Sequence, residues 1–198
     1  MGGGYTVLRP TTVQVVGSNP TVRTNLQGVF MFGWLFKLFR GDTLEDDYKN
    51  DYVTDPWDTR RILVYIHNDG KLPDYFSACV FNAVDQWNKA RNVEFRITTK
   101  RDQAHIKIYA HDLEGRTAGY AWHPKATKHA GHVRIDSSDR VWTGELLTSV
   151  IAHEIGHALG LRHTDGSKSI MFWKIAPRKR VTVWDLERLD RLYAGVGR

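Results

Sequence analysis

The stretch from residue 153 to residue 171, HEIGHALGLRHTDGSKSIM, places histidines at a spacing that suits metal chemistry. If the segment is helical, His153 and His157 lie one turn apart on the same side, within reach of one ion. Gly160 lets the chain reverse after the helix, so that His163 can return as a third ligand. Zinc accepts imidazole nitrogens, and a catalytic zinc site keeps three protein ligands and one open position. The spacing predicts such a site.

Glu154 borders the two helical histidines without having to be a ligand, so it is free to act as a base. Two other interpretations stay open: a helix with solvent-facing histidines, and a closed structural zinc site. Neither explains the full pattern HExxHxxGxxH, in which a glycine and a third histidine follow at fixed distances. We therefore favour a catalytic metal centre.

A helix from Glu145 to Leu159 must position these residues. This stretch contains no proline, and Gly160 is a helix stop of the kind that adopts a left-handed conformation. At 100° per residue the two histidines fall on one side of the helix and the apolar side chains on another. We expect the apolar side to bury against a sheet while the histidines point away from it. These apolar side chains are Leu147, Ile151, Ile155 and Ala158.

Earlier segments alternate between strand and helix patterns. A β-branched and aromatic run at 61–67 ends in the turn Asn68-Asp69-Gly70, and apolar residues recur at helical spacing from 73 to 89. Short strands follow, and a last helix is expected near the C-terminus. This order predicts a mixed sheet covered by helices, in an α+β or α/β domain. The further strands are expected at 93–99, 106–109, 120–122 and 132–136.

The composition fits one globular domain with an appendage, since 198 residues with 41% hydrophobic content make one sizeable core. Cys79 is the single cysteine, so an intramolecular disulfide is excluded. The net charge of +6 permits an anionic partner, but no aromatic-interleaved nucleic-acid motif accompanies the basic residues, which disfavours nucleic acid. The oligomeric state is left open. The basic residues concerned are Lys100, Arg101, Lys125, Lys128 and Arg178–Arg180.

Residues 1–58 differ in character and are predicted to be an N-terminal extension, either a propeptide or a docking arm. Its aromatic-apolar stretch at 28–39 is too short for a transmembrane helix, and it starts too late for a clear signal peptide. The start fits a weak N-myristoylation pattern at Gly2, although a flexible glycine-rich start is the favoured interpretation. An acidic run occupies 41–58, and we expect it to be solvated.

The histidine pattern followed by Met171 resembles the metzincin zinc metallopeptidases, whose signature is HExxHxxGxxH with a later methionine turn, the Met-turn. The gap of eight residues from His163 to Met171 looks most like the matrixins, the matrix metalloproteinase catalytic domains. The resemblance covers about residues 59–198. Gly119–Pro124 is similar to the family's substrate-binding edge strand, and residues 183–193 are similar to its last helix.

The resemblance implies an α+β catalytic domain at 59–198 with a twisted mixed sheet of about five strands, two helices, a Met-turn and a C-terminal helix. It implies one catalytic Zn²⁺ and hydrolysis of protein or peptide substrates, outside the cell by analogy. Family roles carry over onto matching positions only. His153, His157 and His163 would bind the zinc, Glu154 would be the general base, Met171 would form the floor below the metal, and Asp185 would support the Met-turn.

The resemblance also indicates how substrate would be held. Main-chain pairing with an edge strand explains broad endopeptidase activity with few side-chain contacts. Ser149 lies one turn before His153 and is small, so we expect a roomy pocket for a large apolar side chain beside the scissile bond. The pocket wall would come from Phe172 and Trp173. The edge strand would use Gly119, Tyr120, Ala121 and Trp122.

Several positions depart from the matrixin pattern. Tyr120 and Arg134 occupy two histidine positions of the family's structural zinc, and the loop between Asp112 and Ala118 is short. We therefore expect no structural zinc or calcium of the family type. Four other histidines could assemble a different metal site, although dispersed surface histidines are the favoured interpretation. They are His111, His123, His129 and His132.

The alternative function is a structural or assembly protein that retains a peptidase-like zinc domain and uses its N-terminal extension as a docking arm. Glu154 argues against this alternative, because a scaffold does not need the base. Cys79 lies in a predicted helix and cannot be the thiolate of a cysteine-switch propeptide. An acidic residue before Asp58 could cap the metal instead.

Overall fold

A computed structural model describes residues 55–113, 117–126, 129–138 and 141–197 of the 198-residue chain. The expectations for Gly2, for the aromatic stretch and for most of the acidic run lie outside the described residues. Within the described part, no helix has the length and apolar character needed to cross a membrane.

The centre of the fold is a five-stranded sheet in the order β2-β1-β3-β5-β4. Four strands run parallel, and β4 pairs antiparallel with β5 at one edge, so the sheet is mixed as predicted. The predicted bounds at 61–67 and 132–136 are confirmed, and the ends of the other strands differ from the prediction by at most two residues. The strands are β1 (Arg61–His67), β2 (Glu94–Ile97), β3 (Ile106–His111), β4 (Gly119–Ala121) and β5 (His132–Asp136).

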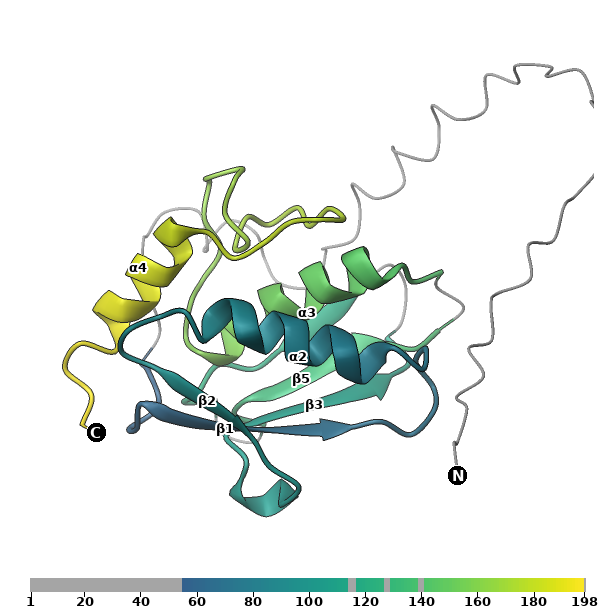
Figure 1. Ribbon diagram of the computed structural model, residues 1–198, viewed down its shortest axis with the longest axis horizontal. Helices are drawn as coiled ribbons and strands as arrows, with labels where there is room; N and C mark the ends of the chain where they lie inside the picture. Colours follow the sequence, from purple (N-terminus) through teal and green to yellow (C-terminus); the bar gives the residue numbers. More distant parts are fainter. Residues whose placement is uncertain (1–54, 114–116, 127–128, 139–140, 198) are drawn as a thin grey trace, which may run out of the picture.

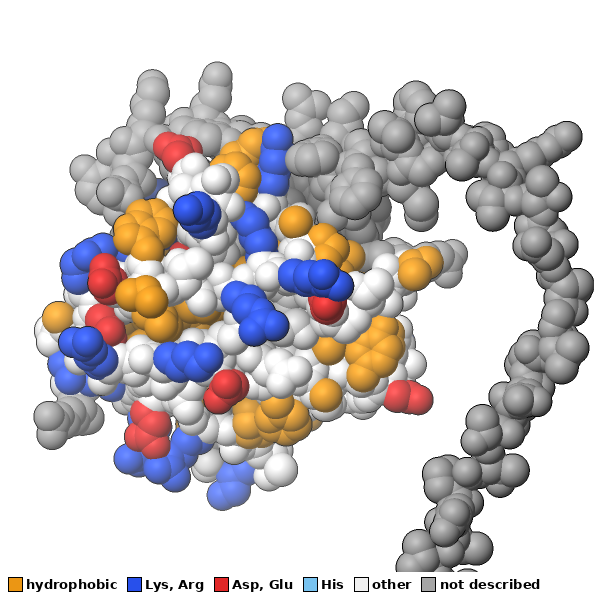
Figure 2. All heavy atoms as spheres, turned by 45° about the horizontal axis from the view of Figure 1, so that its top comes forward, with side chains coloured by type: hydrophobic (Ala, Val, Ile, Leu, Met, Phe, Trp, Pro, Cys, Tyr) orange, Lys and Arg blue, Asp and Glu red, His pale blue; other side chains and the backbone are white. Residues whose placement is uncertain are grey.

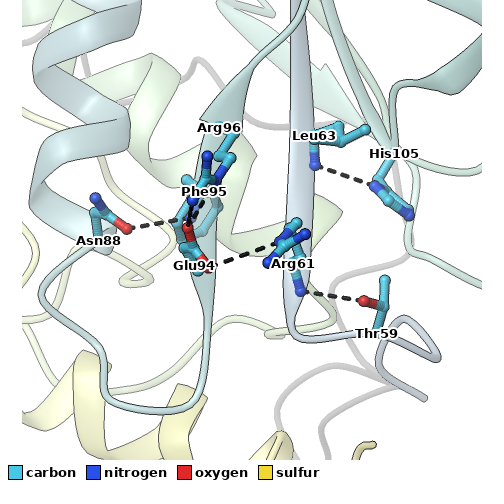
Figure 3. Close-up of polar contacts among 8 residues, drawn as sticks. All are labelled: Thr59, Arg61, Leu63, Asn88, Glu94, Phe95, Arg96 and His105. Carbon is cyan, nitrogen blue, oxygen red and sulfur yellow. Dashed lines mark hydrogen bonds and ion pairs between the residues drawn. The ribbon is translucent and has the colours of Figure 1, made fainter. Parts of the chain in front are cut away.

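Polar side chains complete the hydrogen bonding where β1 and β2 begin (Figure 3). The Asn88 side-chain oxygen accepts from the Phe95 amide at 3.1 Å, which ties the end of α2 to β2. The His105 Nδ1 accepts from the Leu63 amide at 3.0 Å, just before β3 begins. Because the donor is a backbone N–H, His105 has its proton on Nε2. These contacts fix the register of β1 between its two parallel neighbours.

Two helices pack side by side over one face of the sheet, and a third lies at its end (Figure 1). They are α2 (Phe76–Trp87), α3 (Gly144–Ala158) and α4 (Val183–Leu192), with a short 3₁₀ turn, η3 (Arg101–Gln103), between β2 and β3. The helix predicted from residue 73 begins three residues later, because the Pro73 carbonyl accepts from the Phe76 amide in a turn. Between α2 and α3, the Trp87 indole donates to the Ala152 carbonyl at 2.8 Å.

The core lies between the sheet and these two helices. Ile62 and Val64 of β1 and Leu147 and Ile151 of α3 are fully buried, and the apolar side of α3 packs on the sheet as predicted. Thr143 caps α3 by accepting from the Leu146 amide at 3.2 Å, which satisfies one of the free amides of the first turn. The position of α3 over the sheet is therefore fixed at its start and along its length.

Trp57 joins the N-terminal end of the described chain to this core. Its indole donates to the Ala158 carbonyl at the end of α3, at 3.0 Å, and its ring packs edge-on against His105 at 5.3 Å between centroids. Its amide donates to the Tyr193 hydroxyl at 3.4 Å, and a Cβ on Gly131 would lie 2.7 Å from its ring. Trp57 thus links the ends of α3 and α4, the first through its side chain and the second through its backbone amide.

We predict that Trp57→Ala lowers the free energy of unfolding by about 2 to 3 kcal/mol, because it removes a large packed ring and leaves the Ala158 carbonyl without its donor. Denaturant unfolding of the full chain measures this. Phe81→Ala is the control, since Phe81 is 50% exposed and its loss should change stability little. Equal effects of the two substitutions would contradict the anchoring role of Trp57.

Candidate active site

The three histidines of the signature meet at one point below α3. The Nε2 atom of His157 lies 3.1 Å from that of His153 and 3.2 Å from that of His163, and the remaining pair is also 3.2 Å apart. A point about 1 Å out of the plane of this triangle is about 2.0 to 2.1 Å from all three nitrogens, which is the distance zinc requires. Among the described residues, these histidines form the single group of this kind that could hold a metal ion.

Backbone carbonyls orient the two helical histidines for this role. The Nδ1 atom of His153 lies 2.7 Å from the Ile170 carbonyl, and that of His157 lies 2.8 Å from the Leu161 carbonyl. A carbonyl can only accept, so the proton of each ring sits on Nδ1. The Nε2 atoms therefore carry the lone pairs and lie around the common point, as in metal-ligating histidines.

Burial keeps both rings neutral. It lowers the pKa of His153 to about 3 and that of His157 well below its ordinary value, and the neighbouring histidines add to the effect. Protons therefore do not compete for these nitrogens near neutral pH. Metal ligation needs this unprotonated form of the imidazole.

Two glycines allow the segment beneath α3 to close on the histidines. Gly160 has a φ of 102°, and the chain reverses there as the helix ends. Gly156 lies within α3 against Met171, and a Cβ at this position would be 2.3 Å from the Met171 sulfur. Met171 is fully buried, and its sulfur packs against α3 at Gly156, between His153 and His157 in the sequence, because Gly156 has no side chain.

A buried carboxylate supports this methionine turn. Asp185, in the first turn of α4, accepts from the Ser169 hydroxyl and from the Ile170 amide, the latter at 3.1 Å. It also accepts from the Thr182 amide at 2.8 Å and thereby completes a capping box at the start of α4. Since the Ile170 carbonyl orients His153, the geometry of one histidine depends on a side chain 32 residues further along the chain.

Glu154 is placed beside the histidines in an apolar recess. It is 2% exposed, and its Oε1 atom has no hydrogen-bond partner within the described part of the chain. Burial raises the pKa of this carboxyl to about 8. Gly119 of β4 makes the recess, since a Cβ there would lie 2.8 Å from the Glu154 Cγ. The arrangement gives a carboxyl that can hold or release a proton near neutral pH.

The two-sided pattern predicted for α3 is incomplete. The apolar side packs on the sheet as expected, but His153 and Glu154 are buried as well. The reason is that β4 and the methionine turn cover the sides of the helix that carry them. A helical-wheel projection treats uncovered sides as solvent and cannot include these later segments.

A match to the matrixin family spans residues 57–194 of the chain. The chain belongs to the matrixin family. Its five-stranded mixed sheet and three helices form the α+β matrixin-like metzincin domain that the signature implied, and that prediction is confirmed.

Individual matrixins and other metalloproteinases are similar to this chain at moderate identity. Metalloendoproteinase 1 of Glycine max is 30% identical over 160 residues, covering 68% of this chain and 51% of the relative. Matrix metalloproteinase-26 of Homo sapiens is 32% identical over 153 residues, covering 68% and 57%. Karilysin of Tannerella forsythia is 27% identical over 177 residues, covering 76% and 37%. The chain thus spans about half the length of the first two relatives.

The residues expected to contact substrate come from β4, from α3 and from the segment after Met171. β4 carries Gly119–Ala121 and forms the edge of the sheet, so one side of its backbone is not paired by another strand of the described chain. Phe172 and Trp173 follow the methionine turn and are half-buried. Ser149 is almost fully buried, and its hydroxyl lies 3.0 Å from the Lys179 carbonyl. Ser149 on α3 therefore contacts the backbone of the segment before α4.

Aromatic and cationic side chains occupy the region where this matrixin departs from the family pattern. Arg134 stacks over Trp122 at 4.8 Å from the ring centroid, and Trp122 packs edge-on against Tyr120 at 4.6 Å. The Tyr109 hydroxyl lies 2.8 Å from Nδ1 of His132. These contacts join β3, β4 and β5 through side chains.

The remaining histidines are less dispersed than expected. His129 and His132 pack 5.3 Å apart, and both contact the Trp122 ring. His123 lies beside His157, with 5.7 Å between ring centroids. His111 is exposed at the end of β3, as predicted for a surface histidine. The other three are half-buried and pack on neighbouring rings, and among the described residues they form no group that could hold a metal ion.

Gly156 and Lys179 carry positional roles that sequence reasoning did not identify. Gly156 lies inside the HEIGH motif. A glycine in the middle of a predicted helix could have indicated that another segment, here Met171, packs closely against the helix at this position. Lys179 gave no signal, because its place near the histidines depends on the path of the loop before α4.

We predict that Gly156→Ala destabilises the protein by about 1 to 3 kcal/mol and weakens zinc binding, because the new methyl group overlaps the Met171 sulfur. Thermal unfolding and zinc titration measure the two effects. Gly195→Ala is the matched control, since a Cβ there meets nothing within 4 Å. Unchanged zinc affinity in Gly156→Ala would show that Met171 does not support the histidines.

Glu154 should make the stability of the metal-free protein depend on pH. Its carboxyl has a pKa of about 8 in the folded state, against the ordinary value of 4.5 for a solvated glutamate in the unfolded chain. Between these values the folded state retains a proton that the unfolded state loses, so stability falls as pH rises from 4.5 to 8.

Glu154→Gln removes this titration. We predict that it stabilises the chelator-treated protein by about 2 to 4 kcal/mol at pH 8 and little at pH 4. Unfolding measured at both pH values checks this, with Glu187→Gln as the control because Glu187 is exposed. A stability gain of the same size at pH 4 would contradict the burial effect.

Proposed function

We propose that this matrixin is a zinc-dependent endopeptidase, in which His153, His157 and His163 hold the metal and Glu154 is the general base. The observation that carries the proposal is the triangle of three Nε2 atoms, 3.1 to 3.2 Å on a side, beside a buried carboxyl. Three neutral imidazoles that leave one position open suit a catalytic zinc site.

Zinc bound at this site supplies Lewis-acid chemistry, since it lowers the pKa of water towards about 7 and polarises a peptide carbonyl. Glu154 takes a proton from the attacking water and passes it to the nitrogen of the leaving amine. Its Oε1 atom has no hydrogen-bond partner among the described residues, which supports a role in moving this proton. Met171 and Asp185 keep the histidines in place during the reaction.

The edge strand β4 would bind the substrate. An extended peptide that adds to the outer edge of β4 would receive main-chain hydrogen bonds, and these do not depend on the substrate sequence. Gly119 brings that backbone next to Glu154 because it has no side chain. The same residue therefore admits the general base and places the peptide beside it, with Phe172 and Trp173 on the opposite wall.

The division of the chain is part of the proposal. Residues 59–198 are the catalytic domain, and residues 1–58 are an extension that acts as a propeptide or a docking arm. A family-type structural zinc is replaced by the contacts of Arg134, Trp122 and Tyr109, which already join the strands. We propose the same absence for the family-type calcium, on the short loop after Asp112.

A structural or assembly protein is the competing function. The match covers about half the length of these relatives, so the similarity by itself does not extend their whole activity to this chain. Glu154 weighs against it, because an unpartnered buried carboxyl costs stability and gives a scaffold nothing in return. The endopeptidase accounts for the histidines and for the carboxyl together.

We predict that the zinc-loaded full chain cleaves members of a quenched fluorescent peptide library, and that Glu154→Gln lowers kcat/KM by about 100-fold or more. Zinc should remain at one ion per chain in this variant, because Glu154 is not a ligand. A chelator should abolish cleavage by the wild type. Glu187→Gln is the control for a lost surface carboxylate.

The competing function predicts a different result. One zinc per chain without cleavage of any peptide, both in the full chain and after removal of residues 1–54, would favour the assembly protein. Cleavage that appears only after this removal would support the peptidase and would identify the extension as an inhibitory propeptide.

A further inference from the structure

Lys179 brings a positive charge to the wall of the proposed active site. Its ammonium donates to the Ser169 carbonyl at 3.2 Å and lies 4.5 Å from the centroid of the Phe172 ring. Ser169 and Phe172 flank Met171 on either side of the methionine turn. The charge is close enough to His153 to help lower the pKa of that ring.

The backbone of Lys179 is held at the same place. Its carbonyl accepts from the Ser149 hydroxyl at 3.0 Å, and Ser149 stands one turn before His153 on α3. Lys179 therefore spans the space between α3 and the segment after Met171, where the side chain of a bound peptide beside the scissile bond was expected to enter. Because Ser149 is small, the backbone of Lys179 can approach α3 at this position.

Lys179 has no full counter-ion in this position among the described residues. The pKa of its ammonium is lowered, chiefly by burial, and the carboxylate of Asp185 offsets only part of this effect. That carboxylate is already engaged by Ser169, Ile170 and Thr182. A half-buried ammonium whose nearest carboxylate is shared in this way gains from a second carboxylate.

The surroundings carry further positive charge. Ser149 and Lys179 also line a cavity of about 880 Å³ between α2, the start of α3 and residues 178–180. Its lining has an excess of positive charge, because Lys89, Arg178, Lys179 and Arg180 face only Asp85 and Glu145 there, and Glu145 is paired with Arg178 at 2.8 Å. Lys and Arg side chains are spread over the face of the molecule turned to the viewer in Figure 2. The approach to Lys179 thus favours an anionic group.

We infer that Lys179 selects substrates that carry a carboxylate side chain, aspartate or glutamate, next to the scissile bond. This inference rests on the proposed peptidase function and names its substrate class. A carboxylate that enters beside Phe172 forms a charge-assisted hydrogen bond with the ammonium. A large apolar side chain would instead cover the ammonium and remove water from it without replacing the hydrogen bonds, which is unfavourable.

Matched peptides test the inference. The peptide library first identifies a bond that is cleaved, and glutamate is then placed in turn at each position flanking that bond. For each glutamate peptide, two matched peptides carry glutamine, the uncharged isostere, or leucine at the same position. At the selective position, glutamate should exceed glutamine about tenfold in kcat/KM with the zinc-loaded full chain. Lys179→Met should remove this ratio, and Lys179→Arg should retain it. Lys100→Met, which removes an exposed lysine distant from the histidines, should leave the ratio unchanged.

A binding measurement separates this inference from the proposed function. The same peptides are titrated calorimetrically into Glu154→Gln and into Glu154→Gln combined with Lys179→Met. Tighter binding of the glutamate peptide, lost with Lys179, supports the inference even if no peptide is cleaved, in which case the peptidase proposal alone fails. Cleavage with equal rates for glutamate, glutamine and leucine overturns the inference and leaves the peptidase standing. A ratio that survives in Lys179→Met also overturns it.

Discussion

The buried carboxylate of Asp185 is the constraint on which the histidine group depends. It binds the Ser169 hydroxyl and the Ile170 amide on one side and caps α4 on the other. The Ile170 carbonyl then holds His153 with its Nε2 lone pair directed at the metal position. A charge at the start of one helix thereby sets the ring orientation on another, and no flexible side chain intervenes.

The second constraint is close packing around α3, which leaves space only where glycine supplies it. Gly156 admits Met171 from below, and Gly119 admits Glu154 from the side. Both positions would place a Cβ within 3.0 Å of the neighbouring side chain, so the recess and the floor of the site exist because two side chains are absent. The sheet and α2 keep α3 in the position where these contacts form, and the hydrogen bond from Trp87 to the Ala152 carbonyl is part of this support.

The helices and strands could be predicted from the sequence more completely than the contacts that bury their side chains. Local periodicity located β1, β5 and α3, because each has an apolar pattern matched to its own period. The spacing of His153, His157 and His163 was sufficient to predict that they meet, since a helix turn and a glycine reversal are local geometry. The burial of Glu154, the position of Lys179 and the packing of His129 on Trp122 depend on long-range folding of loops, and no local pattern encodes them.

The position of Asp185 after the histidine motif has a consequence for biosynthesis. A nascent chain exposes the HEIGH helix before α4 has left the ribosome, and until then the methionine turn has no carboxylate to hold it. His153 therefore reaches its final orientation only after the start of α4 has been translated. The order of translation thus determines when the group of three histidines can be completed.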